Sequence, residues 1–322
     1  MLTSWQEQLY RQYVSRFRAG HLGHAQLLYG PAMLGKLALV KHLAKRFLCL
    51  QAKDDINACG LCVSCQRYEQ GTHGDFKLLS LELNEKTGKL RTEITVDQIR
   101  ALNEWLSLTT QLGQAQIAII QDAHLLNRNA ANALLKSLEE PNANRYVFLV
   151  TDQPFALPAT IRSRCQRMQM AMPDTDTALA FLKNHGLSGT QASELLRLAD
   201  GNPGLTLAWQ HLGGMAIYQQ VHEDLKACVR NQAGASELSR RWLTDEHAAL
   251  RLNFAVRIGY GAAKKKAFVI DTLSSSTQTL AKLQEWIDAM NHLRLSLSQP
   301  LRHDLSLAGL FHDWQQIFIE TR

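Results

Sequence analysis

Short apolar runs alternate with longer amphipathic stretches along the first half of the chain. Four of the runs are typical of buried strands: residues 24–30 (HAQLLYG), 76–83 (FKLLSLEL), 116–123 (QIAIIQDA) and 146–151 (YVFLVT). Three stretches have the apolar spacing of a helix: residues 36–50, 96–108 and 127–140. Strands that alternate with helices predict a parallel sheet whose strands are joined by right-handed crossovers.

The pattern changes after Pro173, where the strand signal ends. Short helices are predicted up to about residue 210, and helical periodicity then continues from Gly213 to the end of the chain. We therefore predict three domains: a sheet domain over 1–170, a small helical domain over 171–210 and a helical C-terminal domain over 211–322.

Composition narrows the class of protein. The chain has 322 residues, of which 46% are hydrophobic, but no apolar run approaches the ~20 residues of a membrane span. Its N-terminus predicts an amphipathic helix that begins near Thr3 or Ser4 and not a secretory signal, so we expect a cytoplasmic protein without a membrane partner. The net charge of +6 is compatible with nucleic-acid binding but is weak support for it.

The segment GPAMLGKL resembles a phosphate-binding loop, in which glycines expose backbone N–H groups and a lysine reaches the phosphates. Gly30, Gly35 and Lys36 stand at the expected positions, but Leu37 replaces the hydroxyl that would bind Mg²⁺. Lys36 leaves two interpretations open: it holds a phosphate without hydrolysis, or it stabilises the loop by pairing with Asp122.

Asp122 and Thr151 follow two other predicted strands, so they are expected at the same carboxyl edge of the sheet as Gly30. A hydrolysing enzyme would place a glutamate beside Asp122 to orient water, but Ala123 stands there. We therefore predict a vestigial nucleotide site, formed by Gly30, Gly35, Lys36, Asp122 and Thr151, without ATPase activity of its own. A strand-end Asp that caps a turn and a buried β-forming Thr are the plain alternatives.

Four of the six cysteines lie between residues 49 and 65. In a cytosolic chain such a cluster indicates metal and not disulfides. Cys49, Cys59, Cys62 and Cys65 supply the four thiolates of a closed structural Zn²⁺ site. An iron–sulfur cluster is disfavoured because its usual fourth cysteine follows closely and precedes a proline; reduced structural cysteines are the other alternative.

The segment PATIRSRCQRMQM (158–170) carries Arg162, Arg164 and Arg167. It is either a solvated basic helix face or the source of an arginine finger, a guanidinium that reaches a phosphate held by a neighbouring subunit. Spacing alone leaves both interpretations open.

Together these pieces resemble the delta-prime family of clamp-loader subunits of bacterial DNA polymerase III, in the AAA+ superfamily. The resemblance covers the whole chain and is strongest over residues 22–170. Its most specific parts are HAQLLYGPAMLGK, the CxxCxxC cluster with its upstream cysteine, GTHGDF, AANALLKSLEEP and LPATIRSRCQ.

The resemblance implies a RecA-like α/β domain with an inserted zinc site, followed by a helical lid and an all-α collar. It implies a hetero-oligomeric ring with delta and gamma/tau subunits, which uses ATP to load the sliding clamp on primed DNA. Arg164 matches the family's Ser-Arg-Cys motif and would be the trans-acting finger for a gamma/tau ATP site. Thr151 matches a sensor position, but Gly204 stands where active relatives carry a phosphate-sensing arginine. Because positions 37, 123 and 204 all depart from the active pattern, ATP/Mg²⁺ is not expected to bind productively.

Two other functions remain as alternatives. The first is an autonomous AAA+ ATPase such as a DNA-remodelling loader, against which Leu37 and Ala123 weigh. The second is a zinc-dependent DNA-binding module, but Lys53 and Arg67 supply the only positive charges between or just after the cysteines. Specific reading of DNA by this module is therefore not expected.

Overall fold

The computed structural model describes residues 2–52, 56–84, 87–112, 115–140, 142–268, 274–297, 299 and 301–319. It divides into two compact units, one formed by residues 1–184 and 201–205 and the other by residues 185–200 and 206–322. The three domain boundaries expected from the sequence stay a prediction.

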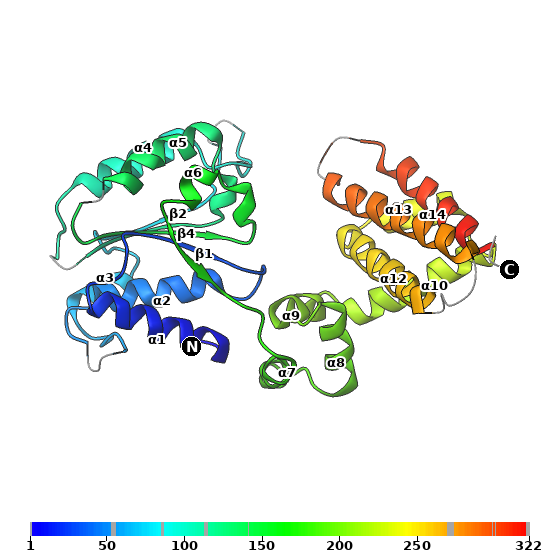
Figure 1. The fold of residues 1–322 in the computed structure, drawn as a ribbon, viewed down its shortest axis with the longest axis horizontal. Helices are drawn as coiled ribbons and strands as arrows, with labels where there is room; N and C mark the ends of the chain where they lie inside the picture. Colours follow the sequence, from blue (N-terminus) through cyan, green and yellow to red (C-terminus); the bar gives the residue numbers. More distant parts are fainter. Residues whose placement is uncertain are drawn as a thin grey trace. The chain divides into compact units, whose positions relative to one another are not determined.

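The first unit is built on a parallel five-stranded sheet (Figure 1). Its strands are β1 (Ala25–Tyr29), β2 (Phe76–Leu79), β3 (Gln116–Ile120), β4 (Arg145–Thr151) and β5 (Gln166–Gln169). They lie in the order β2-β3-β4-β1-β5, and all the pairs are parallel. The interior strand β3 is buried at every position, as expected of a sheet with helices on both faces. The predicted parallel α/β architecture is confirmed.

Helices cover both faces of this sheet (Figure 1). Helices α1 (Ser4–Arg18), α2 (Lys36–Leu48) and α3 (Val63–Glu69) lie on one face, and α4 (Val96–Ser107), α5 (Arg128–Glu139) and α6 (Ala159–Arg162) lie on the other. Neighbouring residues of a strand enter opposite cores: Leu28 belongs to the core under α1 and α2, and Leu27 to the core under α4 and α5. The unit also contains α7 (Thr175–Asn184).

Two elements were missed by the sequence analysis, β5 and α3. Strand β5 lies at the edge of the sheet and buries only Met168, so its sequence lacks the apolar run that marked the other strands. Helix α3 is only seven residues long and lies within the cysteine segment. Neither element has enough hydrophobic periodicity to be recognised from sequence.

The second unit is helical, in agreement with the prediction for the end of the chain. Its helices are α8 (Gly189–Leu198), α10 (Gly214–Val229), α11 (Ala235–Leu243), α12 (Ala248–Phe268), α13 (Ser274–Ser296) and α14 (His303–Ile319). Trp242, Phe254 and Phe311 are fully buried in it. Helix α9 (Pro203–His211) contributes residues to both units.

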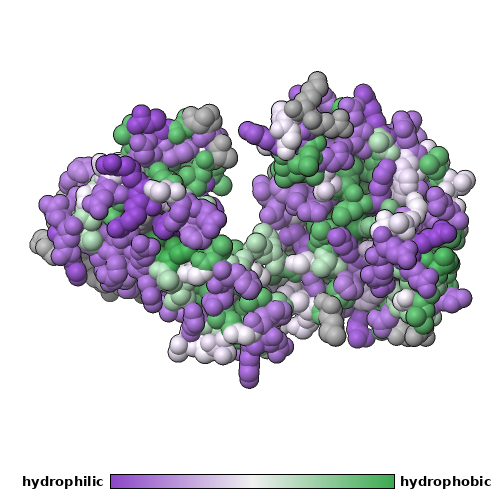
Figure 2. Space-filling view, turned by 180° about the vertical axis from the view of Figure 1, so that it is seen from behind, coloured by the Kyte–Doolittle hydropathy of each residue, from purple (hydrophilic) through white to green (hydrophobic). Residues whose placement is uncertain are grey.

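Hydrophilic residues predominate on the face drawn in Figure 2, where hydrophobic residues gather in smaller patches among them. Among the described residues, no helix combines the length and the hydropathy needed to cross a membrane.

Candidate functional site

Three of the predicted site residues meet at the carboxyl edge of the sheet. Gly30 follows β1 directly, Asp122 lies just beyond the end of β3, and Thr151 ends β4. Since β4 pairs with both β1 and β3, the three positions are neighbours along this edge. The coincidence expected from the sequence is thus a real juxtaposition.

The ammonium group of Lys36 is used by the glycine loop itself. Lys36 Nζ donates to the carbonyl oxygens of Gly30 at 2.9 Å and Pro31 at 2.7 Å. Burial lowers the pKa of Lys36, and the carboxylates of Asp152 and Asp122 oppose that shift. The structure therefore supports a role for Lys36 in stabilising the loop, through two carbonyl groups and not through an ion pair with Asp122.

Helix α1 supplies further hydrogen bonds to the loop. Gln6 Nε2 donates to the carbonyl oxygens of Leu34 at 3.1 Å and Gly35 at 2.9 Å, while its Oε1 accepts from the Thr3 N–H. Trp5 Nε1 also donates to Leu34, at 3.2 Å. Gln6 is only 3% exposed, so its whole amide group is committed to these contacts.

Both glycines of the loop are required by the chain's own packing. A Cβ atom on Gly30 would lie 2.3 Å from the Met170 carbonyl oxygen, and Gly30 has a φ of +150°. A Cβ atom on Gly35, whose φ is +81°, would lie 2.4 Å from Gln6 Nε2. The glycine spacing therefore has a structural reason that needs no bound phosphate.

Residues 201–205 pack against the same loop. Asn202 Nδ2 donates to the Ala32 carbonyl oxygen at 2.9 Å. A Cβ atom on Gly204 would lie 1.8 Å from the Met33 carbonyl oxygen. An arginine at position 204 could not occupy this place unless the loop backbone moved, so the glycine there does more than remove a sensor.

Thr151, at the end of β4, is also bonded within the chain. Thr151 is 1% exposed, and its Oγ1 lies 3.0 Å from His124 Nδ1 and accepts from the Gln153 N–H at 3.0 Å. Ala123 is fully buried in the core beneath α4 and α5. A glutamate side chain at position 123 would therefore have to enter an apolar core.

Arg164 is presented by the short connection between α6 and β5. Ile161 and Cys165 on either side of it are buried in the core beneath α4 and α5, which turns the residues between them outward. The Arg164 side chain is 35% exposed. One terminal nitrogen lies 2.5 Å from a Glu139 carboxylate oxygen, and the other donates to the Thr160 carbonyl oxygen at 2.9 Å.

Arg164 and the glycine loop lie at opposite ends of the strands: Arg164 lies at the amino end of the sheet, and the loop lies at the carboxyl end. Strand β5 pairs in parallel with β1, with Gln166 beside Gln26 and Gln169 beside Tyr29. Arg164 precedes β5, whereas Gly30 lies against Met170 just beyond its end. The four residues of β5 alone span roughly 13 Å, more than an arginine side chain can bridge.

An exposed aromatic residue lies in the segment that leads to Arg164. Phe155 is 85% exposed, the highest value among the large hydrophobic residues in the described part of the chain. The guanidinium of Arg162 lies 5.3 Å from the centre of its ring. Such a side chain gains most when a partner covers it.

The four clustered cysteines form a compact group of sulfur atoms. The Sγ atoms of Cys49, Cys59, Cys62 and Cys65 all lie within 4.8 Å of one another. Gly60, at φ +73°, allows the chain to reverse between two of them. A tetrahedral Zn²⁺ ion requires four such ligands, so the donor set fits the metal.

Backbone N–H groups surround these sulfur atoms. Cys59 Sγ accepts from the Leu61 N–H at 3.4 Å and the Cys62 N–H at 3.2 Å, and these bonds lower the pKa of the Cys59 thiol to about 6. Cys49 Sγ accepts from the Cys59 N–H at 3.2 Å. Donors directed at sulfur stabilise thiolates, which are the form that binds metal.

His73 is not part of the sulfur group. Its Nε2 lies 2.9 Å from Ser64 Oγ, which donates to the Leu48 carbonyl oxygen, and its Nδ1 accepts from the Asp75 N–H. Burial lowers the pKa of His73. The histidine thus links the cysteine segment to the start of β2, and the four sulfur atoms remain the candidate ligands.

A parallel sheet with a glycine loop at the carboxyl end of β1 and a helix beginning at Lys36 is the arrangement of a RecA-like α/β domain. The family described as DNA polymerase III, delta subunit, matches residues 5–174. The chain belongs to this family of delta-prime subunits.

Individual relatives agree with the family match. The chain is 39% identical over 244 residues to DNA polymerase III subunit delta' of Pseudomonas aeruginosa, which covers 74% of this chain and 70% of that protein. It is 36% identical over 205 residues to the Escherichia coli subunit delta', covering 63% of this chain and 59% of that protein. It is also 31% identical over 189 residues to subunit tau of Salmonella typhimurium, covering 57% of this chain and 28% of that protein.

Proposed function

We propose that this chain is a non-hydrolysing subunit of a DNA polymerase III clamp loader, and that Arg164 serves an ATP bound by a neighbouring gamma/tau subunit. The observation that carries the proposal is the position of Arg164 at the amino end of the strands, whereas the glycine loop lies at their carboxyl end. A guanidinium there is out of reach of the chain's own loop but available to a second subunit. When bound by the neighbour, the triphosphate would supply the negative charge that a guanidinium stabilises during phosphoryl transfer.

The state of the glycine loop supports the absence of hydrolysis. Lys36 is bonded to loop carbonyl groups, and Thr151 is bonded to His124 and Gln153. Leu37 packs against the core and offers no ligand for Mg²⁺. Gly30, Gly35, Lys36, Asp122 and Thr151 are accordingly a vestigial nucleotide site, where ATP/Mg²⁺ is not bound productively.

The partners follow from the family. We propose a complex with the delta and gamma/tau subunits, which contacts the sliding clamp and primed DNA as an assembly in the bacterial cytoplasm. The exposed Phe155 ring, in the segment before Arg164, supports a protein contact at this segment. The four cysteines would hold a structural Zn²⁺ with no open position for catalysis.

The test replaces Arg164 with alanine in a reconstituted clamp loader. The complex should still form, as judged by size-exclusion chromatography, but should lose the turnover of the site that Arg164 serves. The loss at that site is large because an arginine finger contributes about 10³-fold or more to kcat. Unchanged steady-state ATPase activity of a fully assembled R164A complex would overturn the finger assignment.

A matched control separates charge from position. Arg167 lies three residues away on β5 and is also exposed, so Arg167→Ala removes the same charge from the same surface. This variant should keep the ATPase activity of the complex. The free wild-type subunit should release no phosphate from ATP, and turnover at the rate of an ordinary ATPase would favour the autonomous enzyme instead.

A further inference from the structure

Glu139, the last residue of α5, forms an ion pair with Arg164 across a long stretch of sequence. The distance between the Glu139 carboxylate oxygen and the Arg164 guanidinium nitrogen is 2.5 Å. The two side chains are 47% and 35% exposed. Ion pairs this exposed contribute little to the stability of a fold, so the pair needs another reason.

The geometry explains what the pair does for the arginine. A free arginine side chain has many rotamers, and most of them direct the guanidinium away from any single target. Here one terminal nitrogen is held by Glu139 and the other by the Thr160 carbonyl oxygen. The two contacts come from different elements, α5 and α6, and together they fix the position and plane of the guanidinium.

We propose that Glu139 is a positioning residue for Arg164: its carboxylate holds the guanidinium in the pose from which it reaches a neighbour's phosphate. This proposal rests on the proposed function of Arg164. Glu139 does not itself touch the nucleotide. It acts by ordering the finger before the subunits assemble, so that less side-chain entropy is lost when the phosphate is contacted.

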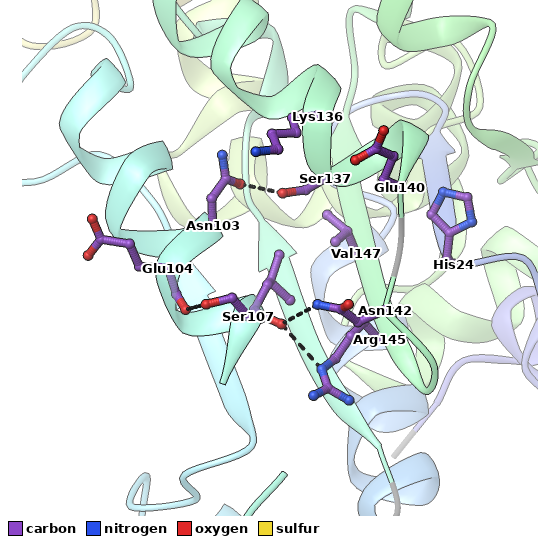
Figure 3. Close-up of a pocket in the computed structure, with 11 residues that line it drawn as sticks. His24, Asn103, Glu104, Ser107, Lys136, Ser137, Glu140, Asn142, Arg145 and Val147 are labelled. Atoms are coloured by element: carbon purple, nitrogen blue, oxygen red, sulfur yellow. Dashed lines mark hydrogen bonds between the residues drawn. The ribbon is translucent and has the colours of Figure 1, made fainter. Parts of the chain in front are cut away.

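The adjacent residue provides a control from the same helix end. Glu140 lines a different feature, a pocket of about 330 Å³ at the amino edge of the sheet, together with His24, Lys136 and Arg145 (Figure 3). Figure 3 shows hydrogen bonds between Asn103 and Ser137 and between Ser107 and Glu104 in this pocket. Asn142 and Arg145 both donate to the Leu106 carbonyl oxygen. Glu139 and Glu140 thus carry the same charge on consecutive residues but serve different surroundings.

The experiment is a double-mutant cycle in the reconstituted clamp loader. Wild-type, E139Q, R164A and E139Q/R164A subunits are assembled with their partners, and kcat and KM for ATP are measured for each complex. Glutamine keeps the length of Glu139 and one acceptor oxygen but removes the charge. The part of kcat that depends on Arg164 should fall about threefold to tenfold in E139Q, with little change in KM, because the finger is less well oriented.

Three further results are expected of a positioning role. The E139Q substitution should have no additional effect once Arg164 is absent, because Glu139 acts only through that side chain. The E140Q complex should retain wild-type kcat. Glu139→Asp, which keeps the carboxylate on a shorter side chain, should recover part of the activity that E139Q loses.

The outcomes distinguish this proposal from the proposed function. A lower rate in R164A with an unchanged rate in E139Q overturns the role of Glu139 and leaves the finger intact. An equal loss from E139Q with and without Arg164 shows a general structural effect and also overturns it. A higher rate in E139Q means that the carboxylate competes with phosphate, which contradicts positioning. If R164A itself is without effect, the proposed function fails first.

Discussion

The glycine loop and the segment that leads to Arg164 adjoin the same pair of strands, β1 and β5, yet they differ in how far their side chains are buried. At the glycine loop, Gln6, Lys36 and Asn202 all bond to backbone carbonyl groups of the loop. In residues 155–164, by contrast, Phe155 is largely exposed, and Arg164 stays partly exposed although it is bonded to Glu139 and Thr160. The glycine loop is covered by side chains of its own chain, whereas residues 155–164 expose side chains that a partner can contact.

This difference shows that residues of a phosphate-loop motif can have packing roles within the chain itself. Position 204 illustrates it, because the glycine there allows residues 201–205 to pack directly on the Met33 carbonyl group. A lysine kept in the loop motif is likewise explained by the two carbonyl groups that it caps. Motif residues can therefore be kept for packing as well as for chemistry.

Loss of the proposed Zn²⁺ ion should have the largest effect on stability. It tests whether the glycine loop and the segment around Arg164 depend on one stable domain. Cys65→Ser removes a buried thiol from the proposed Zn²⁺ site, and structural zinc contributes on the order of 10 kcal/mol of binding free energy. The variant should contain no stoichiometric zinc by elemental analysis and should melt at a much lower temperature. Cys228→Ser, at a buried cysteine outside the group, should keep both metal content and most of the stability.

The packing of residues 201–205 on the glycine loop can be tested with a pair of glycine substitutions. Gly204→Ala would place a Cβ atom 1.8 Å from a backbone oxygen and should cost about 1–3 kcal/mol of unfolding free energy. Gly309→Ala, at a helix position with open space, should instead stabilise by up to about 1 kcal/mol. Chemical denaturation measures both values. A stabilising Gly204→Ala would show that residues 201–205 do not pack on the loop.

The availability of the segment before Arg164 for a partner can be tested at Phe155. Phe155→Ala should change the stability of the free chain by no more than about 0.5 kcal/mol, because the ring is exposed. It should weaken assembly by about 1–2 kcal/mol if the ring is buried in the complex. Affinity for the partner subunits, measured by titration, decides between these. An unchanged affinity would place the interface elsewhere.

The last prediction is that added nucleotide has no effect on the stability of the free subunit. Ligands that bind only the folded state raise its stability, by about 2.7 kcal/mol at a concentration one hundred times Kd. Because Lys36 and Thr151 are engaged by the chain, millimolar ATP with Mg²⁺ should leave the melting temperature of the free subunit unchanged. A reproducible, concentration-dependent increase would show that the loop still accepts a nucleotide.

The sequence was sufficient for the elements that have a clear hydrophobic signature. Strands β3 and β4 lie inside the sheet, so they are continuous apolar runs and were recognised at once. Strand β5 was missed because an edge strand with one buried side chain resembles a polar loop. The cysteine group could be predicted because its ligands are close in sequence as well as in space.

The contacts that define the two regions were harder to predict. Glu139 stands in a recognised motif, but its ion pair with Arg164 joins segments from different crossovers of the sheet. The bonds from Gln6 to the glycine loop join α1 to the start of α2 in the same way. Such long-range polar contacts have no periodicity, so only the folded chain reveals them.

The register between β1 and β5 constrains which length changes the chain can accept. Removal of one residue between Cys165 and Met170 would shift Arg164 by ~3.3 Å along the sheet and would exchange the two faces of β5. A deletion of the same size in the surface turn around Thr87 would change neither strand. Natural insertions and deletions should therefore accumulate in surface turns of this kind and avoid the few residues that separate the guanidinium from the strand.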